Sequence, residues 1–170
     1  MSVESLPPEI LLKILCYLPF DDVITAENVC THWRDVISNS SLWRNLEITY
    51  EYKKTNFQYF AEKISSHSEL IRYVTIRKID EHDEISYILR TCTELEKLQL
   101  FMCRIDVEIL RQVETLSHLK ILFIKNSYLP ANHKSPHSTN INFSLLSNLK
   151  VLVLSDFGLS DENFDSLLLC

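Results

Sequence analysis

Few residues of this 170-residue chain could act as catalytic groups or metal ligands, and their spacing suits neither role. His133 and His137 lie four residues apart, but in a proline-containing loop they share no helix face, and no nearby cysteine completes a metal set. The acidic residues around His82 could suggest an acid/base pair, although a solvated turn explains them more simply. The single glycine, Gly158, excludes phosphate-cradling loops and the GxSxG elbow. We therefore expect no catalytic residue, no metal and no cofactor.

Composition narrows the class of partner. A formal charge of -6 and an isoelectric point near 5.5 argue against nucleic acid, which needs concentrated Lys and Arg. No apolar run approaches the roughly 20 residues that span a bilayer, and the N-terminus is acidic, unlike a signal peptide. Five cysteines without a CxxC pair predict small buried side chains and neither disulfides nor a zinc finger. We expect an intracellular protein, cytoplasmic or nuclear, that binds neither nucleic acid nor membrane.

The elements that could position a binding site begin in a stretch rich in leucine, proline and tryptophan, residues 6–46. Pro7 and Pro8 suit the first turn of a helix, where the missing N–H of proline breaks no hydrogen bond. Pro19 is expected to end that helix. The helix has a wide apolar arc made of two rows, Ile10, Ile14 and Leu18 beside Leu11 and Leu15.

Two further short helices are expected after Pro19. Asp21 or Asp22 can cap the first of them, over residues 23–29, and the second runs from about residue 32 to 38. A polar link and a leucine–tryptophan pair follow. Taken alone, the stretch fits a three-helix bundle whose leucines serve only its own core. Segments this short bury little surface, however, so a partner or a following domain is expected to cover the surplus apolar face.

The order of these residues resembles the F-box family, whose pattern is LPxEIL, YLP, VCxxW and LW. The matching residues are Leu6-Pro7-Pro8-Glu9-Ile10-Leu11, Tyr17-Leu18-Pro19, Val29-Cys30-Thr31-His32-Trp33 and Leu42-Trp43. The resemblance implies a docking module for the Skp adaptor of cullin-based ubiquitin ligases. The implied adaptor-binding residues are Leu6, Pro7, Pro8, Glu9, Ile10, Leu11, Ile14, Leu18, Pro19, Val29, Trp33, Leu42 and Trp43, with Leu6, Pro7, Ile10, Leu11 and Ile14 as the chief contacts.

Internal repeats follow the helical stretch. The pattern LxxLxL recurs at residues 71–76, 95–100, 119–124 and 149–154, with starts 24, 24 and 30 residues apart. The segment 43–48 fits as a lead-in strand. Between these strands the spacing becomes helical, and caps are expected at Asp83, at Asp106 and at Ser160-Asp161. Each unit is therefore predicted to be a strand followed by a helix.

The residue at the Asn/Cys position, which defines the repeat subtype, differs between units. Cys103 occupies the Asn/Cys position, which resembles the cysteine-type leucine-rich repeats, whereas Ile79, Ser127 and Phe157 stand there in the other units. Residues alternating with the leucines are expected to line a concave sheet. The predicted target-binding residues on it are Tyr73, Arg77, Lys97, Gln99, Phe101, Ile121, Phe123, Lys125, Val151 and Val153. Its apolar side fits a partner site and, equally well, the preference of β-branched and aromatic residues for strands.

The predicted fold class is mixed: a three-helix, all-α F-box over residues 1–46, then an α/β leucine-rich-repeat solenoid with a parallel concave sheet over 47–170. Residues 127–142 are expected to form a solvated loop, and the end at Cys170 without a polar capping unit suggests a missing segment. By resemblance, the chain is a non-catalytic receptor subunit whose partners are the Skp adaptor, a cullin through it, and a protein substrate on the repeats. The alternative is a Skp-bound scaffold outside an active ligase, and an independent enzyme is the weakest candidate.

Overall fold

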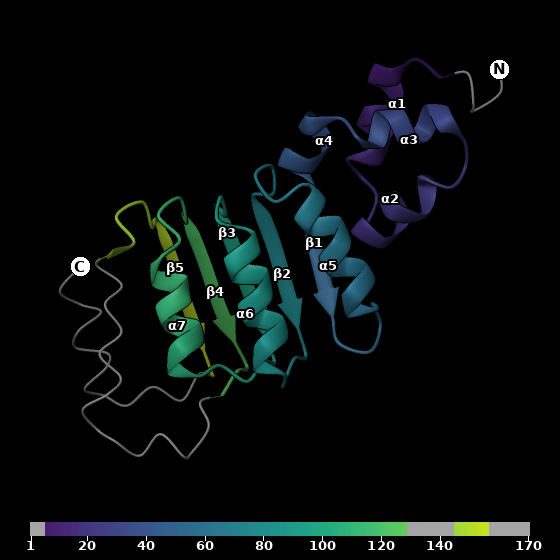
Figure 1. The fold of residues 1–170 in the computed structure, drawn as a ribbon. Helices are drawn as coiled ribbons and strands as arrows, with labels where there is room; N and C mark the ends of the chain where they lie inside the picture. Colours follow the sequence, from purple (N-terminus) through teal and green to yellow (C-terminus); the bar gives the residue numbers. More distant parts are fainter. Residues whose placement is uncertain (1–5, 129–144, 157–170) are drawn as a thin grey trace.

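The computed structural model describes residues 6–128 and 145–156. Four short helices come first: α1 (Pro8–Leu15), α2 (Phe20–Ala26), α3 (Thr31–Ile37) and α4 (Ser40–Asn45). They gather at one end of the molecule, and a row of strands and longer helices extends away from them (Figure 1). Several predictions lie outside the described residues: most of the 127–142 loop, and those at His133, His137, Phe157, Gly158, Ser160-Asp161 and Cys170.

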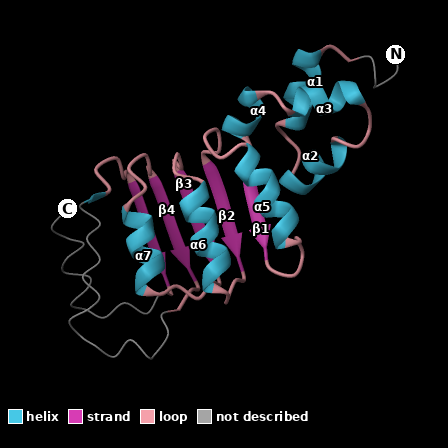
Figure 2. Ribbon diagram, viewed as in Figure 1, coloured by secondary structure: helices cyan, strands magenta, loops and turns pink. Residues whose placement is uncertain are grey.

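The second part is a parallel sheet covered on one face by helices. Its strands are β1 (Glu47–Glu51), β2 (Tyr73–Arg77), β3 (Lys97–Phe101), β4 (Ile121–Lys125) and β5 (Val151–Ser155), hydrogen-bonded in that order. The helices α5 (Phe57–Ser66), α6 (His82–Thr91) and α7 (Val107–Glu114) connect successive strands and lie side by side in front of the sheet (Figure 2). The predicted helical region followed by an α/β region with a parallel sheet is thus confirmed. A curved leucine-rich solenoid stays a prediction.

The strand register repeats as the sequence spacing predicts. Val74, Leu98, Leu122 and Leu152 pair in one row across the sheet. Directly after these four strands comes a residue with positive φ, and none of the four is glycine: Lys78, Met102, Asn126 and Asp156. The first three donate their N–H to the last carbonyl of the next strand, at 2.9 to 3.0 Å. The same backbone turn therefore closes successive units.

The lead-in strand exists, but its register differs from the prediction by two residues. Aligning segment 43–48 on 71–76 would pair Leu46 with Val74, whereas Ile48 pairs with Val74. The reason is that residues 40–45 form helix α4, so the strand begins only at Glu47. Leu46 is left as the buried junction between helix and strand.

The helical end differs from the prediction in number and in caps. A fourth helix, α4, replaces the expected polar link, and Asn39 caps it by accepting from the N–H of Ser41 at 2.9 Å. Helix α2 begins at Phe20, directly after Pro19, so Asp21 and Asp22 lie in its first turn and do not cap it. Carboxylates in a first turn still favour the helix dipole.

Of the two predicted caps on α6 and α7, one is confirmed and one is not. Asp106 caps α7 as predicted, accepting from the N–H of Ile109 at 2.9 Å. Asp83 lies inside the first turn of α6, where Glu81 is the N-cap without a side-chain hydrogen bond.

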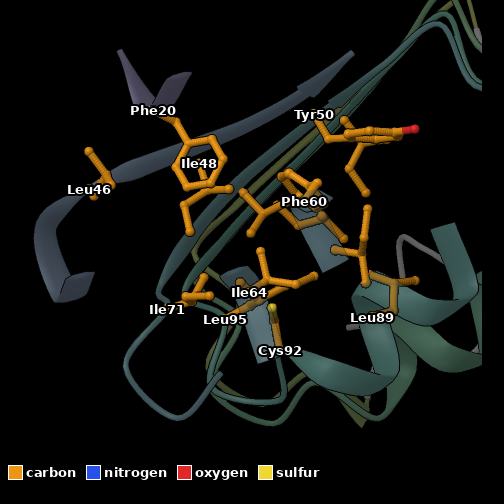
Figure 3. Close-up of a cluster of buried hydrophobic side chains, with 14 of the residues drawn as sticks. Phe20, Leu46, Ile48, Tyr50, Phe60, Ile64, Ile71, Leu89, Cys92 and Leu95 are labelled. Atoms are coloured by element: carbon orange, nitrogen blue, oxygen red, sulfur yellow. The ribbon is translucent and has the colours of Figure 1, made fainter. Parts of the chain in front are cut away.

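One hydrophobic core runs through both parts. Phe20 of α2 meets Trp43 of α4 and Phe60 of α5 edge-on, with ring centroids 6.3 and 5.6 Å apart. Figure 3 shows Phe20 and Ile48 in the same cluster of buried side chains as Phe60 and Ile64. Lys63 of α5 also forms an ion pair with Glu27, at the end of α2. The helical end is therefore packed onto the first strand and first covering helix.

Candidate functional site

Helix α1 presents two different apolar faces. Leu11 and Leu15 are completely buried, and they pack into the core. Ile10 and Ile14, one turn apart, are 45% and 42% exposed, and Tyr17 just after the helix is 90% exposed. Residues spaced i, i+4 and i+7 share a helix face, which is the spacing by which a helix anchors itself in a partner's groove. The exposed row of Ile10, Ile14 and Tyr17 is called here the α1 stripe.

The remaining sequence-predicted docking residues fall into two grades of exposure. Pro7, Pro8, Glu9, Pro19 and Val29 are exposed, and Leu6, Leu18 and Trp33 are partly buried. The Nε2 of His32 lies 2.9 Å from the carbonyl oxygen of Leu6, which fixes the segment that precedes α1 on α3. The residues around α1 therefore form an ordered surface with several apolar side chains in contact with solvent.

Three predicted docking residues have another role. Leu11, Leu42 and Trp43 are completely buried in the chain's own core. The indole N–H of Trp43 donates to the carbonyl of Ile37 at 2.8 Å, and its ring stacks on His67 with centroids 3.6 Å apart. Their side chains cannot touch a partner while the chain is folded, so their direct contact with an adaptor is corrected to support of the core beneath the α1 stripe.

Trp33 differs from Trp43. Its indole Nε1 is buried and has no hydrogen-bond partner among the residues that the structure describes. A buried donor without an acceptor costs roughly 1–3 kcal/mol. Trp33 therefore contributes less to the stability of the isolated chain than its size suggests.

The sheet supplies a second candidate surface. Side chains that alternate with the buried leucines face away from α5, α6 and α7, and this surface is called here the open face. Its three rows, read from β1 to β5, are Glu47, Tyr73, Lys97, Ile121, Val151; then Thr49, Thr75, Gln99, Phe123, Val153; then Glu51, Arg77, Phe101, Lys125, Ser155. All ten predicted target-binding residues lie on it, brought side by side by the parallel register.

Polar contacts gather on the β1 side of the open face. The Nζ of Lys97 lies 3.2 Å from Oε1 of Glu47, and the hydroxyl of Thr75 is 3.0 Å from that same oxygen and 2.9 Å from Oε1 of Gln99. Glu51 accepts from Lys54 and Lys78, each at 2.9 Å. These two hydrogen bonds lower the pKa of the Glu51 carboxyl to about 2. The carboxylates of β1 are thus neutralised by neighbouring lysines.

An open cleft of about 690 Å³ joins the two surfaces. It lies between the turn that links α1 to α2 and the β1 edge of the sheet, and it is lined by Tyr17, Asn45, Thr49 and Arg77 among others. Sequence spacing gave no signal for this cleft, because it depends on how the helical end docks on β1.

The groups considered for chemistry have structural roles where the structure describes them. Burial raises the pKa of the Cys92 thiol to about 12 and that of Cys103 to about 11, as expected for small buried side chains. Nε2 of His82 lies 3.3 Å from Asp106, the N-cap of α7. Among the described residues no three His, Cys, Asp or Glu gather as metal ligands, and no helix there is long and apolar enough to cross a bilayer.

Comparison with known proteins defines the class of the helical end. Residues 3–49 match the family model described as F-box-like, which spans α1 to α4 and the start of β1. The chain therefore carries an F-box-like domain at its N-terminus. Beyond this domain, the repeat architecture is suggested by the names of relatives.

Three relatives show how far the similarity extends. F-box/LRR-repeat protein 12 of Bos taurus is 41% identical over 48 residues, 28% of this chain and 15% of its own length. F-box/LRR-repeat protein 21 of Bos taurus is 30% identical over 90 residues, 53% of this chain and 20% of its length. The SCF E3 ubiquitin ligase complex F-box protein pof2 of Schizosaccharomyces pombe is 26% identical over 164 residues, 92% of this chain. The chain spans only 34% of that third relative, so it matches a minor part of each.

Proposed function

We propose that this chain is a substrate-recognition subunit of a Skp–cullin–F-box ubiquitin ligase and acts inside the cell. The α1 stripe binds the Skp-type adaptor, and the open face of the sheet, as the concave face of leucine-rich repeats, binds the protein that is to be ubiquitinated. The observation that carries the proposal is the exposure of Ile10, Ile14 and Tyr17 in a row on the domain that matches the F-box-like family.

The energetics of the α1 stripe suit a docking surface. Fully burying an isoleucine is worth roughly 1.5–3 kcal/mol, so covering two half-exposed ones contributes about 1 kcal/mol each. Tyr17 adds an aromatic anchor of the kind that dominates protein interfaces. Because Leu11 and Leu15 hold α1 in the core and Pro8 starts the helix, the stripe is ordered before it binds. An ordered stripe loses little conformational entropy on docking.

The proposed mechanism is proximity and requires no catalytic residue in this chain. The adaptor joins the chain to a cullin scaffold that carries a ubiquitin-conjugating enzyme. A target on the open face is then held near that enzyme, so that ubiquitin transfer becomes effectively intramolecular. The target's high local concentration is the chain's contribution to the rate.

The test is a pair of charges in the α1 stripe. The double variant Ile10→Glu, Ile14→Glu is expected to abolish capture of a purified Skp-type adaptor, because docking would bury two unpaired carboxylates. Leu11 is unsuitable for this test, since a charge at a completely buried position would unfold the chain. Tyr59→Glu on α5 is the matched control, because Tyr59 is 44% exposed and lies outside the F-box-like match.

The variants must first show the circular dichroism spectrum and urea midpoint of the parent chain. Capture that survives both glutamates would refute adaptor docking through the stripe. A cullin and ubiquitinated targets in the captured complex support the ligase subunit. Adaptor without cullin supports the alternative, a scaffold that works outside an active ligase.

A further inference from the structure

The row of the open face formed by the last residues of the strands holds two cations beside aromatic rings. Arg77, Phe101 and Lys125 stand on three neighbouring strands, paired in register. The guanidinium carbon of Arg77 lies 5.3 Å from the centroid of the Phe101 ring, and the Nζ of Lys125 lies 5.3 Å from the centroid of Phe123. Strands lie about 4.8 Å apart, so the backbones of Arg77 and Lys125 flank that of Phe101 across roughly 9–10 Å.

The pairing of charges distinguishes these cations from the others on the open face. Lys97 pairs with Glu47, and Glu51 takes both Lys54 and Lys78. Within residues 6–128 and 145–156, no carboxylate lies within ion-pair distance of Arg77 or Lys125. The fifteen residues of the open face include three basic and two acidic ones, so this surface is net positive on a chain of charge -6. Arg77 and Lys125 are therefore the open-face cations that have no carboxylate partner in the described part of the chain.

The surroundings of the two cations are apolar on the β5 side. Phe123 and Val153 lie in the row next to that of Lys125 on β4 and β5, and Ile121 and Val151 lie in the row beyond it. Each of the four is at least partly exposed. Cations that rest on aromatic rings beside an apolar surface suit a ligand with one anionic group and bulky apolar neighbours. Polar contacts of Thr75 and Gln99 border this area on the other side.

We infer that the open face recognises a segment of the target in which an Asp or Glu side chain is next to aromatic or β-branched residues. The carboxylate lies above Phe101 between Arg77 and Lys125, where the guanidinium donates to it in a bidentate manner and the ammonium donates from the other side. The apolar neighbours cover Phe123 and Val153. This inference rests on the proposed function, because it specifies the chemistry of the target that the open face holds.

The charges around the row favour a carboxylate over a phosphate. Glu51 is the residue paired with Arg77 in the register, and Asp156 follows the last residue of the same row. Glu51 is already neutralised by Lys54 and Lys78. Asp156 is therefore the carboxylate that would repel an incoming anion, and it would repel a dianionic phosphate about twice as strongly as a monoanionic side chain. Asp156 offsets part of the positive charge of Arg77 and Lys125, so the charge that remains matches one carboxylate better than a dianion.

The experiment is selection of peptides on the purified full chain. A phage library of random twelve-residue peptides is panned, and the recovered sequences are synthesised with a fluorescent label for binding measurements. Recovered peptides are expected to contain Asp or Glu beside an aromatic or β-branched residue. Replacing that acid by Asn or Gln should weaken binding by about tenfold or more, as for a lost charge-assisted hydrogen bond. Phosphoserine at the same position should bind less well than the acid.

The key variant is Arg77→Gln with Lys125→Gln, and its matched control is Arg90→Gln with Arg111→Gln. Both remove two positive charges, but Arg90 and Arg111 are exposed on α6 and α7, on the other side of the sheet. Only the first pair is expected to lose binding, again by about tenfold or more, and rising salt should weaken binding to the parent chain.

Four outcomes would overturn the inference: no peptide recovered, recovered peptides without an enriched acid, equal loss in both double variants, or tighter binding of phosphoserine. Failure here is distinguishable from failure of the proposed function. Adaptor capture depends on the α1 stripe alone, so it would persist in the variant Arg77→Gln, Lys125→Gln. Conversely, the variant Ile10→Glu, Ile14→Glu would lose adaptor capture and keep peptide binding.

Discussion

Replacing Trp43 by phenylalanine tests whether the helical end and the sheet unfold as one unit. Trp43 lies where the two parts meet: it is completely buried, stacks on His67 after α5 and meets Phe20 of α2 edge-on. Its indole N–H is the hydrogen-bond donor to the carbonyl of Ile37. If the shared core is one cooperative unit, weakening this residue must lower the stability of regions far from it.

The magnitude follows from two losses. Phenylalanine leaves the Ile37 carbonyl without its donor, which costs roughly 1–3 kcal/mol, and the smaller ring gives up about 1 kcal/mol of packing on His67. The sum, about 2–4 kcal/mol, is a large part of the ~5–15 kcal/mol that stabilises a typical domain. Trp43→Ala would lose still more, roughly 3–5 kcal/mol, and is too severe to measure well.

The assay follows urea unfolding with two local reporters. In Trp43→Phe the fluorescence of Trp33, the remaining tryptophan, reports the helical end. Pulsed alkylation of Cys92 and Cys103, both completely buried, reports the region around α6 and β3. Both midpoints are expected to fall together by about 1 M or more, since m is about 1–3 kcal/mol per molar urea.

The matched control is Trp33→Phe, the same substitution at the other tryptophan. Because the Trp33 indole has no hydrogen-bond partner among the described residues, this variant is expected to change the free energy of unfolding by about 1 kcal/mol or less. In Trp43→Phe, a midpoint of Trp33 fluorescence that falls while the midpoint of cysteine alkylation stays in place would show two independent units. It would refute the single shared core.

Two further predictions concern the turns after the strands and the charges on β1. Met102→Gly is expected to raise the free energy of unfolding by about 0.5–1 kcal/mol in urea titrations. Methionine is held at φ 55°, where a side chain costs roughly 1–2 kcal/mol, and glycine removes that cost. Part of the gain is lost again, because glycine raises the entropy of the unfolded chain. For Glu51, a folded-state pKa of about 2 lies below the ordinary value, so its ion pairs stabilise the fold above the ordinary carboxyl range and are lost as pH falls toward 2. Lys78→Met should raise the midpoint of the Glu51 carboxyl in an NMR titration.

Each of these two predictions has an internal control. Asn126→Gly sits at the equivalent turn, at φ 50°, and should change stability less than Met102→Gly, since asparagine visits this region readily. A destabilised Met102→Gly would contradict the strain argument. An unchanged Glu51 midpoint in Lys78→Met would show that Lys54 alone holds the carboxyl ionised.

The repeat register could be predicted from the sequence, and the turns that create it could not. Equal spacing of the leucine pattern is enough to pair Val74 with Leu98 and Leu122, because each unit brings the chain back by one strand. Lys78 and Met102 carry no compositional signal for positive φ, because neither residue type favours this conformation; only Asn126 and Asp156 do. Beside β1, the pattern failed for a physical reason: helix α4 occupies the residues that form a loop elsewhere.

The candidate docking site was predictable in its location but not in its composition. Ile10 and Leu11 are neighbours in one wide apolar arc, and sequence alone cannot say which of them faces α3 and α4. In the structure the answer depends on Trp43 and Phe20, which lie outside α1 in the sequence and anchor the helical end on α5. Burial of Leu11 and exposure of Ile10 are therefore properties of the tertiary packing.

That packing bears directly on the proposed mechanism. The effective concentration of a target near a conjugating enzyme is high only when the connection between the two docking surfaces is short or stiff. Here Phe20 contacts Phe60, Lys63 pairs with Glu27, and Leu46 joins α4 to β1 without a linker. A partner docked on the α1 stripe consequently sets the orientation of the first strands as well. The packing that buries Trp43 against Phe20 is thus part of the packing that would hold the proposed ligand surface, the open face, in a fixed direction relative to the α1 stripe.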